Sequence, residues 1–232
     1  MADCRLLSAV IASYSLLPST ALLIGLAEDG LPVLLNLQDH ALGPTLVAAD
    51  AGAGKTRLLQ TIARGIEHLH DPVRVHFAVI TEHPNEWAAF EGSEHCHGVF
   101  PFHHALATGL LHCAALGESA GSVSGRALVL LTDGYEALAS DGDLRDSAGA
   151  ILQSPSPRGV ASIVTLDTKV SQLPAAWLEV FRVRLFGYVR DRRTAGILGG
   201  SEGAVLGGLQ PPHQFATQEN GNWLAFWLPE ID

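Results

Sequence analysis

The segment Ala49–Thr56, which reads ADAGAGKT, constrains the fold of this chain more than any other part of the sequence. It follows the short apolar run Thr45–Ala49 and opens a stretch, residues 55–68, whose apolar residues recur at helical spacing. Small residues between a strand and a helix let backbone N–H groups close around a phosphate, and the helix turns its positive end toward the same anion. The pattern matches the phosphate-binding loop G-x-x-x-x-G-K-[ST], except that Ala49 replaces the first glycine.

This loop predicts a site for ATP and Mg²⁺. Lys55 is expected to reach the β- and γ-phosphates, and the Thr56 hydroxyl is expected to face the magnesium ion. A chance Gly-Lys-Thr in a glycine-rich chain is the alternative, and the flanking strand and helix argue against it. The residues assigned to nucleotide binding are Asp50, Ala51, Gly52, Ala53, Gly54, Lys55, Thr56 and Arg57.

A second motif is the apolar strand predicted over residues 127–132, which ends in Asp133. A rigid strand can place this carboxylate beside the ion held by Thr56, although an ordinary buried strand before an Asp-Gly turn would look similar.

The next position, Gly134, lacks the carboxylate that commonly polarises the attacking water. Glu136 is a candidate substitute, or else a solvated residue of a helix start. Loss of a positioned base reduces a rate by about 10²–10⁴-fold, so ATP binding is expected and hydrolysis is left open.

Strands alternating with helices predict a mostly parallel sheet covered on both faces, with ligands at the carboxyl ends of its strands. Residues 92–102 are expected to be irregular, and the turn at 219–222 indicates a closing hairpin. Helices are predicted at 55–68, 85–90, 104–116, 135–153 with a break at Gly142, 174–180 and 192–198. Strands are predicted at 22–25, 32–37, 45–49, 73–80, 127–132, 161–166, 183–187, 214–218 and 223–227.

Composition limits the class of protein. The formal net charge of −10 argues against a mainly electrostatic nucleic-acid binder, but leaves room for a small basic patch. The three cysteines show no CxxC spacing, which favours a reducing, cytoplasmic location. Residues 6–17 are apolar but are interrupted by Ser and Tyr and end at Pro18, so no signal peptide is expected, and no run is long enough to span a membrane.

Several segments together resemble the FtsK/SpoIIIE/HerA class of DNA-translocating ATPases, over nearly the whole chain from about residue 20. The phosphate loop is generic, whereas the order and spacing of the later segments are specific. The matching segments are GLAEDGLPVLLNL, TLVAADAGAGKTRLLQTIA, ALVLLTDGYEAL, RGVASIVTLDTKVSQLPAAW, FRVRLFGYVRDRRTAGILGG and GGLQPPHQFATQENGNWLAFWLP.

The resemblance implies a RecA-like α/β core in one domain, residues 1–232. Residues 1–20 would form an extension, 20–45 a leading strand pair and 45–232 the core with its closing hairpin. It also implies a ring, usually a hexamer, with double-stranded DNA in the channel and ATP between subunits. An arginine of the neighbouring subunit would contact the γ-phosphate, with Arg184, Arg192 and Arg193 as candidates, unless they serve in ion pairs. Asp167 occupies the sensor position, where the class usually has a neutral amide.

Gly134, Asp167 and the acidic net charge depart from the pattern of a working translocase. Type VII secretion ATPases are relatives in which some ATPase domains are degenerate. The alternative function is therefore a hydrolytically weak regulatory or scaffold subunit, in a ring of identical chains or with related ATPase subunits.

Two further groups of residues are interpreted as structural. The histidine-rich segment at 94–104 (Glu94, His95, Cys96, His97, His103 and His104) could hold a metal, but it corresponds to a connection in the family, and no metal site is expected there. The tryptophans are expected to anchor the core or a subunit interface. They are Trp87, Trp177, Trp223 and Trp227.

Overall fold

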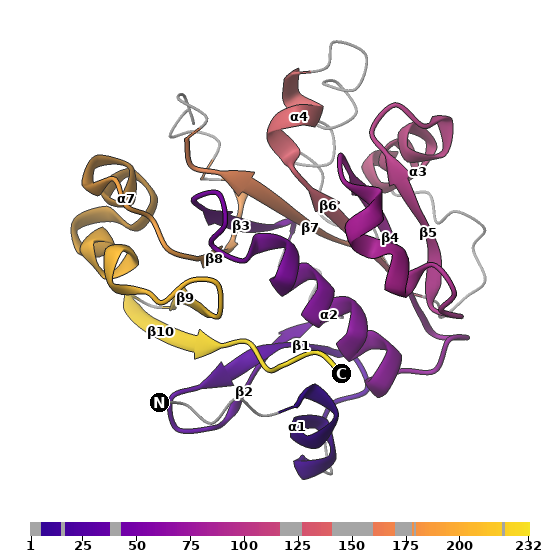
Figure 1. Ribbon diagram of the computed structural model, residues 1–232, viewed down its shortest axis with the longest axis horizontal. Coiled ribbons are helices and arrows are strands. Elements are labelled where there is room, and N and C mark those ends of the chain that lie inside the picture. Colours follow the sequence, from indigo (N-terminus) through magenta and orange to yellow (C-terminus); the bar gives the residue numbers. More distant parts are fainter. Residues whose placement is uncertain are drawn as a thin grey trace.

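A single ten-stranded sheet forms the centre of the molecule in a computed structural model, which describes residues 6–14, 17–37, 43–116, 127–140, 160–169, 178, 180–219 and 221–232. Within these ranges the strand order is β2-β1-β10-β9-β8-β3-β7-β6-β4-β5 (Figure 1). The strands are β1 Ala21–Ala27, β2 Pro32–Asn36, β3 Thr45–Ala49, β4 Val75–Thr81, β5 Cys96–Pro101, β6 Ala127–Asp133, β7 Val160–Asp167, β8 Val183–Phe186, β9 Gln214–Glu219 and β10 Asn222–Trp227.

Helices cover both faces of this sheet, and α2 lies across its middle (Figure 1). The helices are α1 Leu7–Ser13, α2 Lys55–Leu69, α3 Ala105–Leu116, α4 Tyr135–Ser140 and α7 Arg192–Gly199, with 3₁₀ helices η1 Pro84–Phe90 and η2 Gly200–Gly208. None of the described helices combines the length and the apolarity that a membrane crossing requires.

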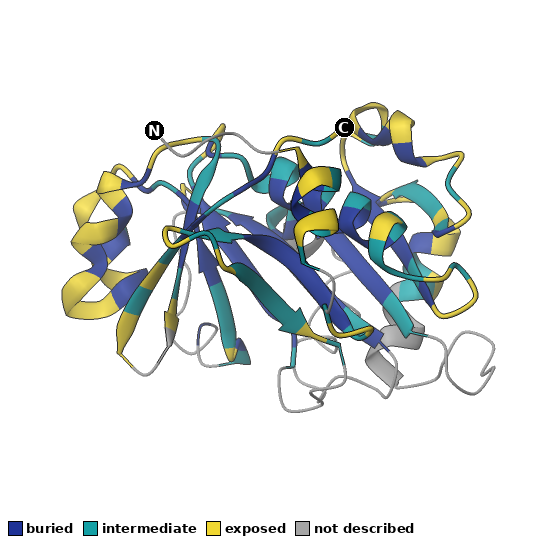
Figure 2. Cartoon of the chain, turned by 90° about the horizontal axis from the view of Figure 1, so that it is seen from below, coloured by how far each residue is buried: buried dark blue, intermediate teal, exposed yellow. Residues whose placement is uncertain are grey.

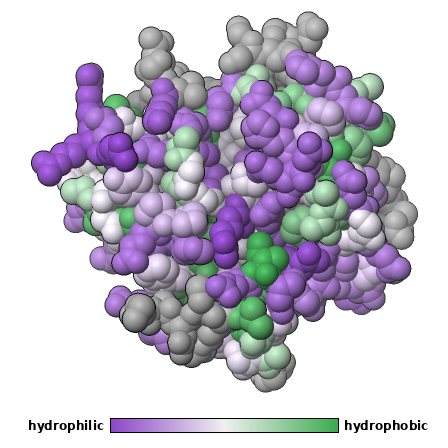
Figure 3. Space-filling model, viewed as in Figure 1, coloured by the Kyte–Doolittle hydropathy of each residue, from purple (hydrophilic) through white to green (hydrophobic). Residues whose placement is uncertain are grey.

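The core is divided by the sheet because successive strand residues point to opposite faces. In β3, Val47 packs with α2 and η1, whereas Leu46 and Ala48 pack with α4, α7 and η2 on the other face. The central strands are therefore apolar on both sides, as a covered parallel sheet requires. Figure 2 shows this buried layer between the helices, and the face seen in Figure 3 is mostly hydrophilic.

Parallel pairing from β8 to β5 brings the carboxyl ends of these strands to one edge. β3 lies between β7 and β8, with Ala49 opposite Asp167 in the parallel register. β6 lies between β7 and β4, with Asp133 opposite Thr81. The phosphate loop, Asp133 and Asp167 therefore lie at the same edge, as the sequence patterns predict. The antiparallel strands β9, β10, β1 and β2 extend the sheet on the other side of β8.

The sequence-based assignment was wrong over residues 92–102, where β5 forms instead of an irregular segment. β5 is the edge strand beside β4, its register shifts between Phe77 and Val79, and its residues are exposed or half-buried. Such a strand lacks the apolar alternation by which strands are recognised. Helices α1 and η2 were not anticipated. Most of 135–153 and 174–180 lies outside the described residues.

Candidate nucleotide-binding site

The loop between β3 and α2 has the backbone geometry of a phosphate cradle. Gly52 and Gly54 have φ of 73° and 95°, in the left-handed region that other residues avoid. A Cβ on Gly54 would lie 2.1 Å from the Pro212 carbonyl oxygen, so glycine is also required by the close approach of that chain segment. Together these glycines hold the loop N–H groups at the start of α2, where an anion is favoured.

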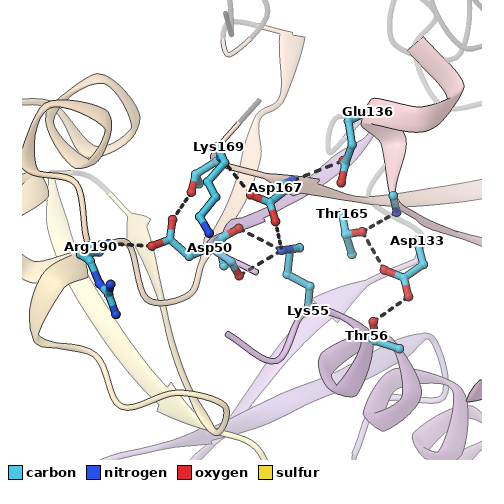
Figure 4. A network of polar contacts seen from close by, with 12 residues as sticks. Asp50, Lys55, Thr56, Asp133, Glu136, Thr165, Asp167, Lys169 and Arg190 are labelled. Atoms are coloured by element: carbon cyan, nitrogen blue, oxygen red, sulfur yellow. Dashed lines mark hydrogen bonds and ion pairs between the residues drawn. The ribbon is translucent and has the colours of Figure 1, made fainter. Parts of the chain in front are cut away.

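Lys55 lies across the mouth of the loop (Figure 4). Its Nζ donates to the carbonyl oxygens of Ala49 at 2.9 Å and Asp50 at 3.1 Å. The same ammonium lies 3.6 Å from Asp167 Oδ2. A phosphate would compete with this carboxylate for the lysine, while the role of Asp167 as a sensor stays a prediction.

A second chain of hydrogen bonds joins α2 to β6 and β7. The Thr56 hydroxyl donates to Asp133 Oδ2 at 2.7 Å, and the Thr165 hydroxyl donates to Asp133 Oδ1 at 2.8 Å. The Gly134 N–H donates in turn to the Thr165 hydroxyl oxygen at 2.8 Å. The arrangement supplies one hydroxyl and one carboxylate side by side, the hard oxygen donors that suit Mg²⁺. Thr56 and Asp133 therefore lie within hydrogen-bond distance of each other, and their joint binding of Mg²⁺ stays a prediction.

Asp50 has a role that the sequence pattern did not reveal. Its carboxylate accepts a hydrogen bond from the Thr168 hydroxyl and another from the Arg190 N–H at 2.9 Å (Figure 4). Its own N–H donates to the Tyr188 carbonyl at 3.0 Å. Asp50 therefore connects the carboxyl ends of β3, β7 and β8. Its carboxylate points toward the Thr168 hydroxyl and the Arg190 N–H.

The loop opens into a cleft of about 850 Å³. Its lining beyond the loop comes from the segment after β7, the β8–α7 connection, α7 and Pro211. Of these residues, the sequence analysis assigned only Arg193. The Asp191 side chain caps α7 by accepting from the Thr194 N–H and hydroxyl, each at 2.8 Å, and these bonds lower the pKa of its carboxyl. The cleft residues outside the loop are Thr168, Lys169, Tyr188, Arg190, Asp191, Arg193, Thr194, Ile197 and Pro211.

The three candidate arginines have different surroundings. Arg193 lines the cleft of its own chain. The Arg184 guanidinium donates to the Phe181 carbonyl at 2.9 Å, and Arg192 is exposed at the start of α7. Arg57 lies in the first turn of α2 and is not part of the cleft lining. A contact from any of these arginines to a neighbouring subunit's nucleotide stays a prediction.

The histidine-rich segment is used structurally. His95 is buried, and its Nδ1 lies 2.9 Å from the Val75 carbonyl, while the His97 ring packs beside His76. Within the described part of the chain, no group of three or more His, Cys, Asp or Glu residues could hold a metal ion. Trp87 is fully buried and Trp223 packs edge-on against Phe186, whereas Trp177 lies outside the described residues.

No family model and no curated protein matches this sequence, but solved structures do. The cytoplasmic domain of the type VII secretion ATPase EccC from Thermomonospora curvata superposes with a TM-score of 0.70 at 17% identity, covering 95% of this chain and 30% of that one. The chain has the RecA-like fold of the FtsK/SpoIIIE-type P-loop ATPases. This confirms the resemblance seen in the sequence at the level of the fold.

Two other structures with this RecA-like fold were solved with ATP analogues. The pCW3 conjugation coupling protein TcpA, in a monomer form with ATPγS, gives a TM-score of 0.68 at 13% identity over 95% of this chain and 68% of its own. The genome-packaging NTPase B204 of Sulfolobus turreted icosahedral virus 2, with AMPPCP, gives 0.59 at 13% identity over 81% and 98%. The chain spans only 30% to 47% of the lengths of the EccC and EssC structures that it matches.

We expect Asp50→Asn to loosen the phosphate loop. The asparagine amide has only one acceptor oxygen, so its N–H₂ group would face one of the two donors, Thr168 Oγ1 or Arg190 N, and one hydrogen bond would be lost. A hydrogen bond to a charged group contributes about 1.5–3 kcal/mol. The free energy of unfolding in urea should fall by a similar amount. Asp29→Asn, in the exposed β1–β2 turn, is the control and should change the free energy of unfolding by less than about 0.5 kcal/mol. Equal stability of the two variants would contradict the role given to Asp50.

Proposed function

We propose that this chain binds ATP with Mg²⁺ and hydrolyses it as a subunit of an oligomeric motor. One observation carries this proposal: the Thr56 hydroxyl lies 2.7 Å from the Asp133 carboxylate beside a loop in which Lys55 and two left-handed glycines converge. The donor set matches the needs of a nucleoside triphosphate and its metal. The cleft of about 850 Å³ beside the loop is large enough for a nucleotide.

The chemistry that follows from these residues is mainly positioning and charge stabilisation. Loop N–H groups around Gly52 and Gly54 would donate to phosphate oxygens, and Lys55 would donate to the terminal phosphates. Thr56 and Asp133 would hold Mg²⁺, with Thr165 keeping the Asp133 carboxylate in place. When bound, Mg²⁺ would neutralise charge on the β- and γ-phosphate oxygens.

Double-stranded DNA is the proposed substrate of the motor. The neighbours named above serve secretion, conjugation coupling and genome packaging. With a net charge of −10, contacts to DNA would have to come from a restricted basic surface in a ring. Assembly as a ring and a cytoplasmic location belong to the same proposal.

A second candidate function is a regulatory or scaffold subunit that binds ATP and hydrolyses it weakly. Two observations favour it: Gly134 supplies no carboxylate, and Asp167 pairs with Lys55 at 3.6 Å. Such a subunit would use bound nucleotide to stabilise its fold and its interfaces.

Steady-state phosphate release distinguishes the two functions. We expect turnover with Mg–ATP that long duplex DNA increases and that EDTA abolishes, together with an increase in solution mass on addition of Mg–ATP. ATP binding without turnover would favour the scaffold. Turnover without any DNA binding at low salt would exclude DNA as substrate, and a monomer under all conditions would exclude the ring.

A further inference from the structure

Gly134 occupies the position where a water-activating carboxylate was expected. Its φ of 97° lies in the left-handed region, where a non-glycine residue is strained by about 1–2 kcal/mol. The bond from its N–H to the Thr165 hydroxyl holds this conformation next to Asp133. The chain therefore turns at Gly134 directly after β6. Its backbone conformation there differs from that of a strand that continues into a glutamate.

The turn at Gly134 changes where the next residues lie. Helix α4 begins at Tyr135, whose ring is buried in the core cluster that also contains Phe102. With Tyr135 held in the core, Glu136 lies over the carboxyl end of β7. Its Oε2 accepts a hydrogen bond from the Asp167 N–H at 3.3 Å. Figure 4 shows the Glu136 carboxyl directed toward Asp167, whose own carboxylate faces Lys55.

Burial raises the pKa of the Glu136 carboxyl, and the nearby Asp167 adds to this effect. Hydrogen bonds from its own N–H and from that of Asp167, and the positive charge of Lys55, act in the opposite direction but do not cancel the shift. The hydrogen bond from the Asp167 N–H to Glu136, and the ion pair between Asp167 and Lys55, place the Glu136 carboxyl at the edge of the site that holds Lys55. A carboxylate with a raised proton affinity takes a proton from water more readily.

We propose that Glu136 activates the attacking water in place of the carboxylate absent at Gly134. This inference rests on the proposed ATPase function. The water oxygen forms a bond to the γ-phosphorus while the bond between that phosphorus and the β–γ bridging oxygen breaks. The bridging oxygen leaves with the electron pair as part of ADP, and the proton of the water passes to the Glu136 carboxylate and then to solvent.

The other carboxylates at this edge differ from Glu136 in their partners or in their exposure. Asp167 Oδ1 accepts from the Lys169 N–H at 2.9 Å, and its Oδ2 pairs with Lys55. Both oxygens of Asp133 accept hydrogen bonds from hydroxyls. Glu82 follows Thr81, which pairs in register with Asp133, but Glu82 is exposed. Glu82 is the main alternative because it follows the end of β4 at the level of Gly134. Glu82→Gln is therefore the matched control for Glu136→Gln.

The test compares Glu136→Gln and Glu82→Gln in the full chain. Phosphate release gives the turnover, calorimetry gives the Kd for Mg–ATP, and rapid isolation of the protein followed by chromatography identifies the bound nucleotide. For Glu136→Gln we expect turnover to fall by about 10²–10⁴-fold, with a Kd within about threefold of the unaltered protein and with ATP, not ADP, retained. Glu82→Gln should turn over normally and retain ADP. If Glu136→Gln does not fold, Glu136→Asp is measured in its place. Because aspartate keeps a carboxylate, we expect this variant to retain part of the turnover.

Each opposite result overturns the inference. Turnover of Glu136→Gln within threefold of the unaltered protein, or loss of turnover in Glu82→Gln alone, would remove Glu136 from the chemistry. Loss of ATP binding in a folded Glu136→Gln would show a structural role instead. If the unaltered protein binds ATP without turnover, the Glu136 inference fails while nucleotide binding stands. If it does not bind ATP, the proposed function fails first.

Discussion

Lys55→Ala is expected to weaken Mg–ATP binding by about 100-fold or more and to abolish phosphate release. A hydrogen bond to a charged group contributes about 1.5–3 kcal/mol, and this ammonium is expected to contact two phosphates. Because every 1.4 kcal/mol corresponds to about a factor of ten in Kd, losing both contacts gives an effect of this size. The substitution also removes the donors that connect the lysine to the Ala49 and Asp50 carbonyls. Calorimetric titration with Mg–ATP and a phosphate-release assay measure the two effects.

Arg74→Ala is the matched control for this experiment. Arg74 is exposed and precedes β4, so it lies at the amino end of a strand whose carboxyl end faces the site. Removing its charge leaves the phosphate site intact and should change the Kd by less than about threefold, since surface charges act weakly at a distance. Equal losses in the two variants would mean that general charge, not the Lys55 ammonium, supports binding. Unchanged binding in Lys55→Ala would refute the nucleotide site.

Gly54→Ala is expected to destabilise the fold by about 2–5 kcal/mol and to eliminate ATP binding. The left-handed backbone alone makes alanine unfavourable by about 1–2 kcal/mol. In addition, the new Cβ would lie 2.1 Å from the Pro212 carbonyl oxygen, so the segment before β9 must move. Overpacking of this kind costs about 1–3 kcal/mol. The free energy of unfolding in urea measures the combined effect.

Gly52→Ala separates the two contributions within the same loop. Gly52 is also left-handed, with φ of 73°, but a Cβ there would meet no atom within 4 Å. Only the backbone strain should remain, so its free energy of unfolding should fall by about 1–2 kcal/mol. If Gly54→Ala is no less stable than Gly52→Ala, the contact with Pro212 does not constrain the loop.

Glu136 was a candidate in the sequence only because it is the first carboxylate after Gly134. Its relation to Asp167 could not be predicted, because the two residues belong to different strand–helix units. The hydrogen bond from the Asp167 N–H requires β7 to lie beside β6, and it requires the turn that Gly134 permits. Sequence spacing alone is equally compatible with a solvated side chain at the start of α4.

The sequence by itself determined the elements that depend on neighbouring residues. The phosphate loop, the strand before it, the helix after it and the apolar strand ending at Asp133 all follow from local residue patterns, since small residues, apolar runs and helical spacing act within one or two turns of chain. The closing hairpin follows from its turn residues in the same way.

Only the tertiary structure decided which of these elements share an edge. Asp50 contacts Thr168 and Arg190, which lie 118 and 140 residues away along the chain, because β3 is inserted between β7 and β8. The outer wall of the cleft is formed for the same reason by the connection after β8. Pairings between distant strands are selected by burial on both faces of the sheet and by backbone hydrogen bonding. A short apolar stretch indicates a buried strand, but it does not specify which strand becomes its neighbour.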